Sequence, residues 1–124
     1  MPMEYVVVTQ DPQVPGGFLF KTGTINGNGD NVVIAQPNVP QRLVITALQV
    51  QNESATPVTI IVKAGGSPFW RTLAQNQGDG VCLPLVPGRG ISLGFDQAQN
   101  GNALIINLST GVQVGYSLQY YWTS

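Results

Sequence analysis

Carboxylates are the main candidates for chemistry in this chain, because it contains no histidine. Histidine is the usual general base, proton shuttle and metal ligand, so acid–base catalysis here would need a pair of acidic side chains. Most of the acidic residues stand in turn-rich stretches, where aspartate is common for its turn geometry. The six are Glu4, Asp11, Asp30, Glu53, Asp79 and Asp96. Their spacing marks no pair, so the sequence predicts a protein that is not an enzyme.

The single cysteine, Cys82, is no stronger a candidate for a nucleophile. A reactive thiol needs an activating base, and the chain has no histidine to supply one. Cys82 stands in the apolar stretch of residues 81–85, so we expect it to be a small buried hydrophobe. A lone cysteine also rules out a disulfide within the chain.

Two glycine-containing stretches invite comparison with ligand-binding loops. Residues 26–31 read Asn-Gly-Asn-Gly-Asp-Asn, but they lack the spacing of acids and the terminal glutamate of a calcium-binding EF-hand. Gly88, Arg89 and Gly90 come before a predicted strand, whereas a phosphate-binding loop opens a helix. We interpret both stretches as turns, and the sequence predicts no metal and no cofactor.

The aromatic residues suggest a second class of function, a sugar-stacking platform like those of carbohydrate-binding β-sandwich modules. The candidates are Trp70, Tyr116, Tyr120, Tyr121 and Trp122. Tyr116, Tyr120 and Trp122 share the apolar parity of one predicted strand, which favours a place in the core. Trp70 with Arg71 is the better candidate for an exposed contact, because both residue types are enriched at interface hot spots.

The last predicted strand, residues 112–122, is the clearest element. Its residues alternate between an apolar side and a mostly polar side, as in a half-buried strand. The apolar side holds Val112, Val114, Tyr116, Leu118, Tyr120 and Trp122. An apolar side of this size needs a second sheet to cover it, so the strand predicts a sandwich.

Eight to nine short strands are predicted in all, separated by Gly, Pro and Asn turns about every ten residues. They cover residues 18–25, 32–35, 42–52, 58–63, 69–73, 81–85, 91–95, 103–108 and 112–122. No segment has a helical period of sufficient length. The predicted fold is all-β, a two-sheet sandwich of about eight antiparallel strands. A jelly roll is favoured over an immunoglobulin-like fold, whose Cys…Trp…Cys core is missing.

The 42–52 strand contains a change of parity. Leu43, Ile45 and Ala47 are apolar on one side early in the strand, and Leu48 and Val50 are apolar on the other side later. Such a switch predicts a bulge or a bend, as where a strand passes between sheets.

Residues 1–17 are predicted to be an extended N-terminal arm before a single domain at 18–124. Prolines and glycines interrupt regular structure between residues 11 and 17. The run Tyr5, Val6, Val7 and Val8 has strand propensity. It is expected either to close an edge of its own domain or to exchange with a neighbouring subunit.

The composition narrows the range of partners. Charged residues make up 9% of the chain, against about 25% in ordinary soluble domains, and the net charge is −1. No basic cluster suggests nucleic acid, and no polybasic amphipathic segment or long apolar run suggests a membrane. The solvent-facing positions must be filled by uncharged polar residues, which suits a protein that is packed against others.

Three stretches together resemble a type of small tailed-phage virion protein. They are residues 42–52, the run Val81-Cys82-Leu83-Pro84-Leu85 with the turn at 87–90, and residues 103–109 leading into 112–116. Members of that type resemble jelly-roll decoration (cement) proteins, which sit on the outer surface of the phage capsid, commonly as trimers, and bridge neighbouring capsomers.

This resemblance implies a non-enzymatic virion structural protein, a homotrimer whose partner is the major capsid protein. The candidate interface residues are Tyr5, Val6, Val7, Val8, Trp70 and Arg71. Similar jelly rolls occur in phage tails and fibres, so the alternative is a tail- or fibre-associated domain that binds a receptor or a carbohydrate.

Overall fold

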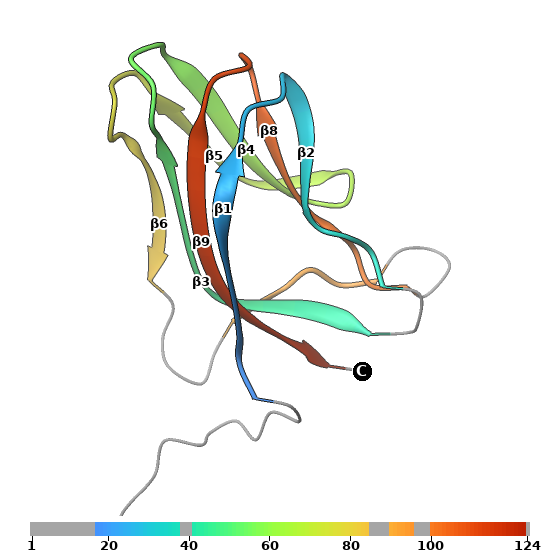
Figure 1. The fold of residues 1–124 in the computed structure, drawn as a ribbon. Helices are drawn as coiled ribbons and strands as arrows, with labels where there is room; N and C mark the ends of the chain where they lie inside the picture. The colour runs from blue at the N-terminus through green and yellow to red at the C-terminus, as the bar shows by residue number, and fades with distance from the viewer. Residues whose placement is uncertain (1–16, 38–40, 85–89, 96–99, 124) are drawn as a thin grey trace, which may run out of the picture.

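The computed structural model describes residues 17–37, 41–84, 90–95 and 100–123, which form two β-sheets packed face to face (Figure 1). The strands are β1 (Leu19–Ile25), β2 (Gly29–Ile34), β3 (Arg42–Asn52), β4 (Val58–Ala64), β5 (Ser67–Ala74), β6 (Gly80–Pro84), β7 (Ile91–Ser92), β8 (Leu104–Leu108) and β9 (Val114–Thr123). No helix occurs in these ranges, so none there is long and apolar enough to span a membrane.

The strand order identifies the architecture as a jelly roll. Sheet A has the order β1-β9-β3-β6, with β7 also pairing β3, and sheet B has the order β2-β8-β4-β5. The antiparallel pairing is nested, because β1 pairs β9, β2 pairs β8, β3 pairs β6 and β7, and β4 pairs β5. This is the pattern of one long hairpin folded over into two sheets. The predicted all-β sandwich and its jelly-roll form are confirmed.

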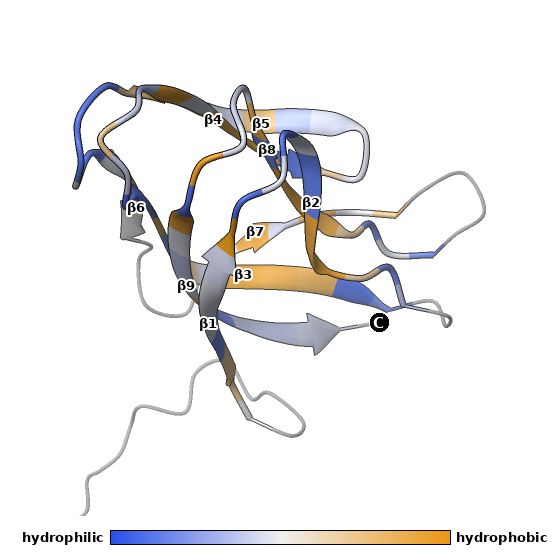
Figure 2. Ribbon diagram, turned by 45° about the horizontal axis from the view of Figure 1, so that its top comes forward, coloured by the Kyte–Doolittle hydropathy of each residue, from blue (hydrophilic) through white to orange (hydrophobic). Residues whose placement is uncertain are grey.

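The core lies between the two sheets, and alternation builds it most clearly on two neighbouring strands of sheet B. Side chains of Leu104, Ile106 and Leu108 on β8 are fully buried, as are those of Ile60 and Val62 on β4. Figure 2 shows that β4 and β8 contain hydrophobic residues along their length. Each such side chain stabilises the fold by about 1.5–3 kcal/mol through its removal from water.

Strand β9 has the two sides that its sequence predicts. Val114 and Leu118 are buried, and Tyr116, Tyr120 and Trp122 pack against the core while remaining partly exposed. The rings of Tyr120 and Trp122 meet edge to face, with centroids 6.3 Å apart. The aromatic residues of this parity are therefore core residues, as predicted.

Strand β3 contains the predicted irregularity as a β-bulge at Thr46. Ile45 pairs with Tyr120 and Ala47 with Gln119, so Thr46 is the extra residue, and its hydroxyl donates a hydrogen bond to the carbonyl of Gln119. Strand β3 bends sharply near its middle (Figure 1) but stays in sheet A throughout. The bulge lets inward-facing residues fall on both sequence parities.

Two segments differ from the prediction. The predicted strand at 91–95 is wrong in extent, because β7 ends at Ser92 and Gly94 has a φ of +72°, which extended backbone does not adopt. Strand β2 begins at Gly29, earlier than residue 32, because Asn31 supports the preceding turn. Its side chain donates to the carbonyl of Gly27 at 2.8 Å and accepts from the N–H of Gly27.

Asn52 is the one polar residue that is fully buried among the described residues. Its Nδ2 donates to the carbonyls of Thr56 and Ala74 at 2.9 and 3.2 Å. Its Oδ1 accepts from the backbone N–H and the hydroxyl of Ser54, both at 2.9 Å. One side chain thus joins the end of β3 to the turn before β4 and to the end of β5.

We predict that Asn52→Ala lowers the free energy of unfolding by about 2–3 kcal/mol, because it leaves buried backbone groups without partners. Urea denaturation followed by tryptophan fluorescence measures the change. Gln51→Ala is the matched control, since Gln51 is the preceding residue and its side chain points outward; it should cost less than about 0.5 kcal/mol. Equal stability of the two variants would contradict the role given to Asn52.

Candidate functional site

The described acidic residues do not converge on one another. Asp30 is paired with Lys63 at 3.1 Å, the Oε1 of Glu53 accepts from Gln113 at 2.6 Å, and Asp79 accepts from the N–H of Asn76 at 3.0 Å. No cluster of three His, Cys, Asp or Glu side chains occurs in the part of the chain that the structure describes. Glu4, Asp11 and Asp96 lie outside that part.

The outer face of sheet A is the most distinctive surface of the described molecule. The register places outward-facing residues in rows across β1, β9, β3 and β6. One row joins Thr22, Ser117, Gln49 and Cys82, and the next joins Thr24, Gly115, Gln51 and Gly80. A further row contains Phe20, Gln119 and Ala47. None of the residues in these rows is charged, although Arg42 lies at the start of β3 and the carboxylate of Glu53 lies against Gly115.

Three shallow hollows lie on this outer face, and Gln49 lines all of them. The largest, with a volume of about 310 Å³, is a groove that runs from Phe20 on β1 across β9 and β3 to Cys82 on β6. We call it the apolar groove. Smaller hollows of about 120 and 180 Å³ flank the side chain of Gln51, and Glu53 stands at the rim of the first.

Uncharged amide side chains accompany the apolar groove. Those of Gln49, Gln51 and Gln119 lie on the outward side of their strands, exposed or half-buried, and make no hydrogen bond to another described residue. Phe20, at the groove's end, is 75% exposed. A surface with exposed apolar area, free amides and almost no charge resembles the centre of a protein interface more than an ordinary solvated surface.

Cys82 corrects one prediction, because it is exposed on this face and not buried in the core. It pairs with Gln49, which points outward, so the register of the edge strand sets its direction. The contiguous apolar run at 81–85 carries no alternation, and its sequence therefore could not show which residues face outward.

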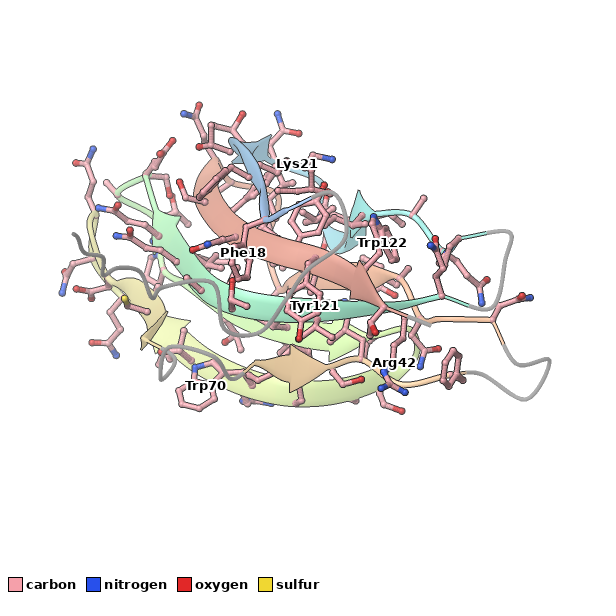
Figure 3. The ribbon with its side chains drawn as sticks, turned by 90° about the horizontal axis from the view of Figure 1, so that it is seen from below. Phe18, Lys21, Arg42, Trp70, Tyr121 and Trp122 are labelled. Carbon is pink, nitrogen blue, oxygen red and sulfur yellow. The ribbon has the colours of Figure 1, made fainter. Side chains whose placement is uncertain are left out.

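The N-terminal end of the described chain lies on the same face. Phe18 packs its ring edge to face against Tyr121, with centroids 5.8 Å apart (Figure 3). Tyr121 pairs with Val44 and points away from the core, opposite in parity to Trp122. Gly17, with a φ of +75°, precedes this contact. Residues before Gly17 therefore begin at the rim of sheet A.

Trp70 and Arg71, the predicted exposed contact, lie on the edge strand β5 of sheet B. Both are exposed, but they are successive residues of a strand and point to opposite sides. Trp70 pairs with Val62, whose side chain faces the core, and Arg71 pairs with Ile61 on the outer face. They therefore do not form one continuous surface, and their role as interface residues stays a prediction. Tyr5, Val6, Val7 and Val8 lie outside the described residues, so their role stays a prediction.

The outer face of sheet B has a different character from that of sheet A. It carries the charged residues Asp30, Lys63 and Arg71 among the exposed apolar side chains of Val32 and Leu73. The hydrogen bond from Asn107, together with that from the Lys63 ammonium, holds the pKa of Asp30 below its usual value. The outer face of sheet B thus carries three charged side chains along its strands, whereas Arg42 and Glu53 lie at the margins of the outer face of sheet A.

The sequence analysis did not select Phe20, the most exposed of the large described hydrophobic residues. The sequence contained a signal for its exposure. Phe18 and Phe20 lie on the same side of the strand as Thr22 and Thr24, and Ile25 lies on the opposite side. The side of a strand that carries polar residues usually faces solvent, so aromatic residues on that side are expected to be exposed.

Comparisons with known proteins add little. No family model matches the chain, and no curated protein matches it. A solved structure that is similar is the virus-like particle of extra small virus from the giant freshwater prawn Macrobrachium rosenbergii. It is 12% identical, with a TM-score of 0.41, and the match covers 100% of this chain and 90% of that one. At this level of similarity, nothing about function follows.

We predict that Phe20→Ser changes the free energy of unfolding by less than about 0.5 kcal/mol, because the ring is largely in water already. Urea denaturation measures this, with Leu108→Ala as the comparison, expected to cost about 2–5 kcal/mol. The result would show that Phe20 is not needed for folding. A loss above 2 kcal/mol for Phe20→Ser would place its ring in the core and remove it from the surface.

The lowered pKa of Asp30 predicts a small contribution to stability that depends on pH. A carboxyl group with a depressed folded-state pKa stabilises the protein above the unfolded-state value of about 3.9, and this stabilisation is lost as the pH falls through the folded-state pKa. The urea midpoint of wild type should therefore exceed that of Asp30→Asn at pH 6, and the gap should narrow below pH 4. A gap that is constant across this range would exclude the linkage.

Proposed function

We propose that this chain is a non-enzymatic structural protein of a virion, a decoration (cement) protein that forms a homotrimer on the outer surface of a phage capsid. It would bridge neighbouring subunits of the major capsid protein and stabilise the head. The observation that carries the proposal is the outer face of sheet A, which is nearly uncharged, contains the apolar groove and has free amides. Such a face is suited to permanent burial against protein.

The chemistry of the face supports an adhesive role over a catalytic one. Burying a charge against a partner is costly unless the partner supplies an opposite charge, whereas a face without charges avoids this cost. The described acidic residues are each paired locally and do not line a common cleft. The sequence resemblance to tailed-phage virion proteins adds the capsid as the location, and the jelly-roll strand order is compatible with it.

Trimerisation would explain how modest single contacts hold a shell together. Three linked binding sites turn the second and third contacts into intramolecular events, which raises avidity steeply over the affinity of one site. In this proposal the sheet A face is covered in the assembled particle, and the two separate contacts at Trp70 and Arg71 on β5 remain candidates for touching the capsid protein.

The experiment is cosedimentation with emptied heads of the tailed phage that encodes the chain. We expect wild type to sediment with the heads, and the free protein to show three times the chain mass of 13.2 kDa in analytical ultracentrifugation. Phe20→Ser should weaken head binding by tenfold or more, because the covered face and its avidity are lost. Val32→Ser, which removes an exposed apolar side chain from the outer face of sheet B, should change it by less than about threefold.

Two outcomes would contradict the proposal. A failure of wild type to sediment with the heads would exclude the decoration role. Selective binding of a saccharide on a glycan array, without head binding, would favour the alternative of a receptor- or carbohydrate-binding domain of a tail or fibre.

A further inference from the structure

The apolar groove on sheet A begins at β1, where the described chain enters the fold. Phe20 lines that end of the groove, and Phe18, two residues earlier, points to the same side of β1 and packs on Tyr121. A segment that precedes Gly17 therefore starts beside the groove. The groove's other lining residues come from β9, β3 and β6, so a ligand lying in it would cross four strands.

The chain itself contains a segment whose chemistry matches the groove. Residues 5–10 carry no charge and begin with Tyr5, Val6, Val7 and Val8. An apolar run is costly to leave in water, and a groove lined by uncharged residues accepts it without an unpaired charge.

We propose that the apolar groove binds the 5–8 segment of a second copy of this chain. The spacer at residues 9–17 contains Pro12 and Pro15, and the residue before each proline favours extended backbone. Residues 9–16 would span about 25 Å in that conformation, at roughly 3.1 Å each. A spacer of this reach is long enough to carry the segment to the groove of a neighbouring domain.

The geometry of this contact favours a closed ring. Donor segment and acceptor groove are different surfaces, so each copy gives one segment and receives one, which is a head-to-tail arrangement. A ring leaves no segment and no groove unused, whereas an open chain leaves one of each. The contact between segment and groove would hold the proposed trimer together. Only the number of copies, three, rests on the proposed function. The contact itself is tested without any capsid.

The single cysteine of the chain provides the test, because Cys82 lies exposed in the groove. Val6→Cys and Val7→Cys are made separately in the full chain, since neighbouring residues of an extended segment face opposite ways. Mild oxidation should join one of them to Cys82 of another copy and give covalent dimers and trimers on a non-reducing gel. The yield should fall on dilution, because the disulfide is intermolecular.

The matched control moves the acceptor thiol to the other sheet. In Cys82→Ser with Val32→Cys, the thiol is exposed on the outer face of sheet B, and the same donor cysteine should give at least tenfold less covalent product. Equal yields from the two acceptors would overturn the groove as the binding site. A disulfide that forms within one copy at every concentration would overturn the second copy as the donor.

A second measurement needs no new cysteine. Modification of Cys82 by a thiol reagent should be at least tenfold slower in the wild-type full chain than in the full-length triple variant Val6→Ser, Val7→Ser, Val8→Ser. The two rates should converge on dilution, and equal rates at high concentration would contradict the proposal. A chain that forms the covalent trimer yet does not sediment with phage heads would overturn the decoration role and leave this contact standing.

Discussion

The antiparallel pairing of β3 with β9 is the interaction on which the rest of the structure depends. It runs the full length of β3, from Arg42 opposite Thr123 to Asn52 opposite Val114. The pair forms the centre of sheet A, and every other strand of that sheet bonds to one of these two. Because a strand alternates its side chains, one register determines both the core side and the outer face. A slip of one residue would exchange them.

The bulge at Thr46 is what makes this pairing compatible with the sequence of β3. Without the extra residue, Leu43 and Ile45 could not face the core together with Leu48 and Val50, since the two pairs have opposite parity. The parity change was readable from the sequence because Gln49 and Gln51 mark the polar side of the later pair, Leu48 and Val50, which have the opposite parity to Leu43 and Ile45. The sequence could not show whether this parity change produces a bend within one sheet or a passage between two sheets. The strand order shows that it is a bend within sheet A.

The fold class was predictable, and the candidate site was predictable only in part. Alternation along β9 from Val114 to Tyr120 identifies the core, because a glycine or a polar residue stands between successive apolar residues there. The contiguous apolar run around Cys82 offers no such contrast, and its direction comes from pairing with Gln49 across the sheet. Trp70 and Arg71 are adjacent in sequence, which suggested one contact, but strand geometry separates them. The direction of each of these side chains is set by pairing between strands, which the local sequence does not show.

The register of β3 with β9 also places uncharged residues on the outer face of sheet A. The chemistry of this face limits which surfaces can cover it. Free amides such as those of Gln49 and Gln51 are well solvated, but each costs about 1–3 kcal/mol if it is buried without a partner. A covering surface must therefore supply donors and acceptors as well as apolar area. Extended backbone does both, since it presents N–H and C=O groups at regular intervals between its side chains. A face with this combination favours an extended protein segment over a smooth apolar ligand, and a chain that carries such a segment can satisfy the face with a copy of itself.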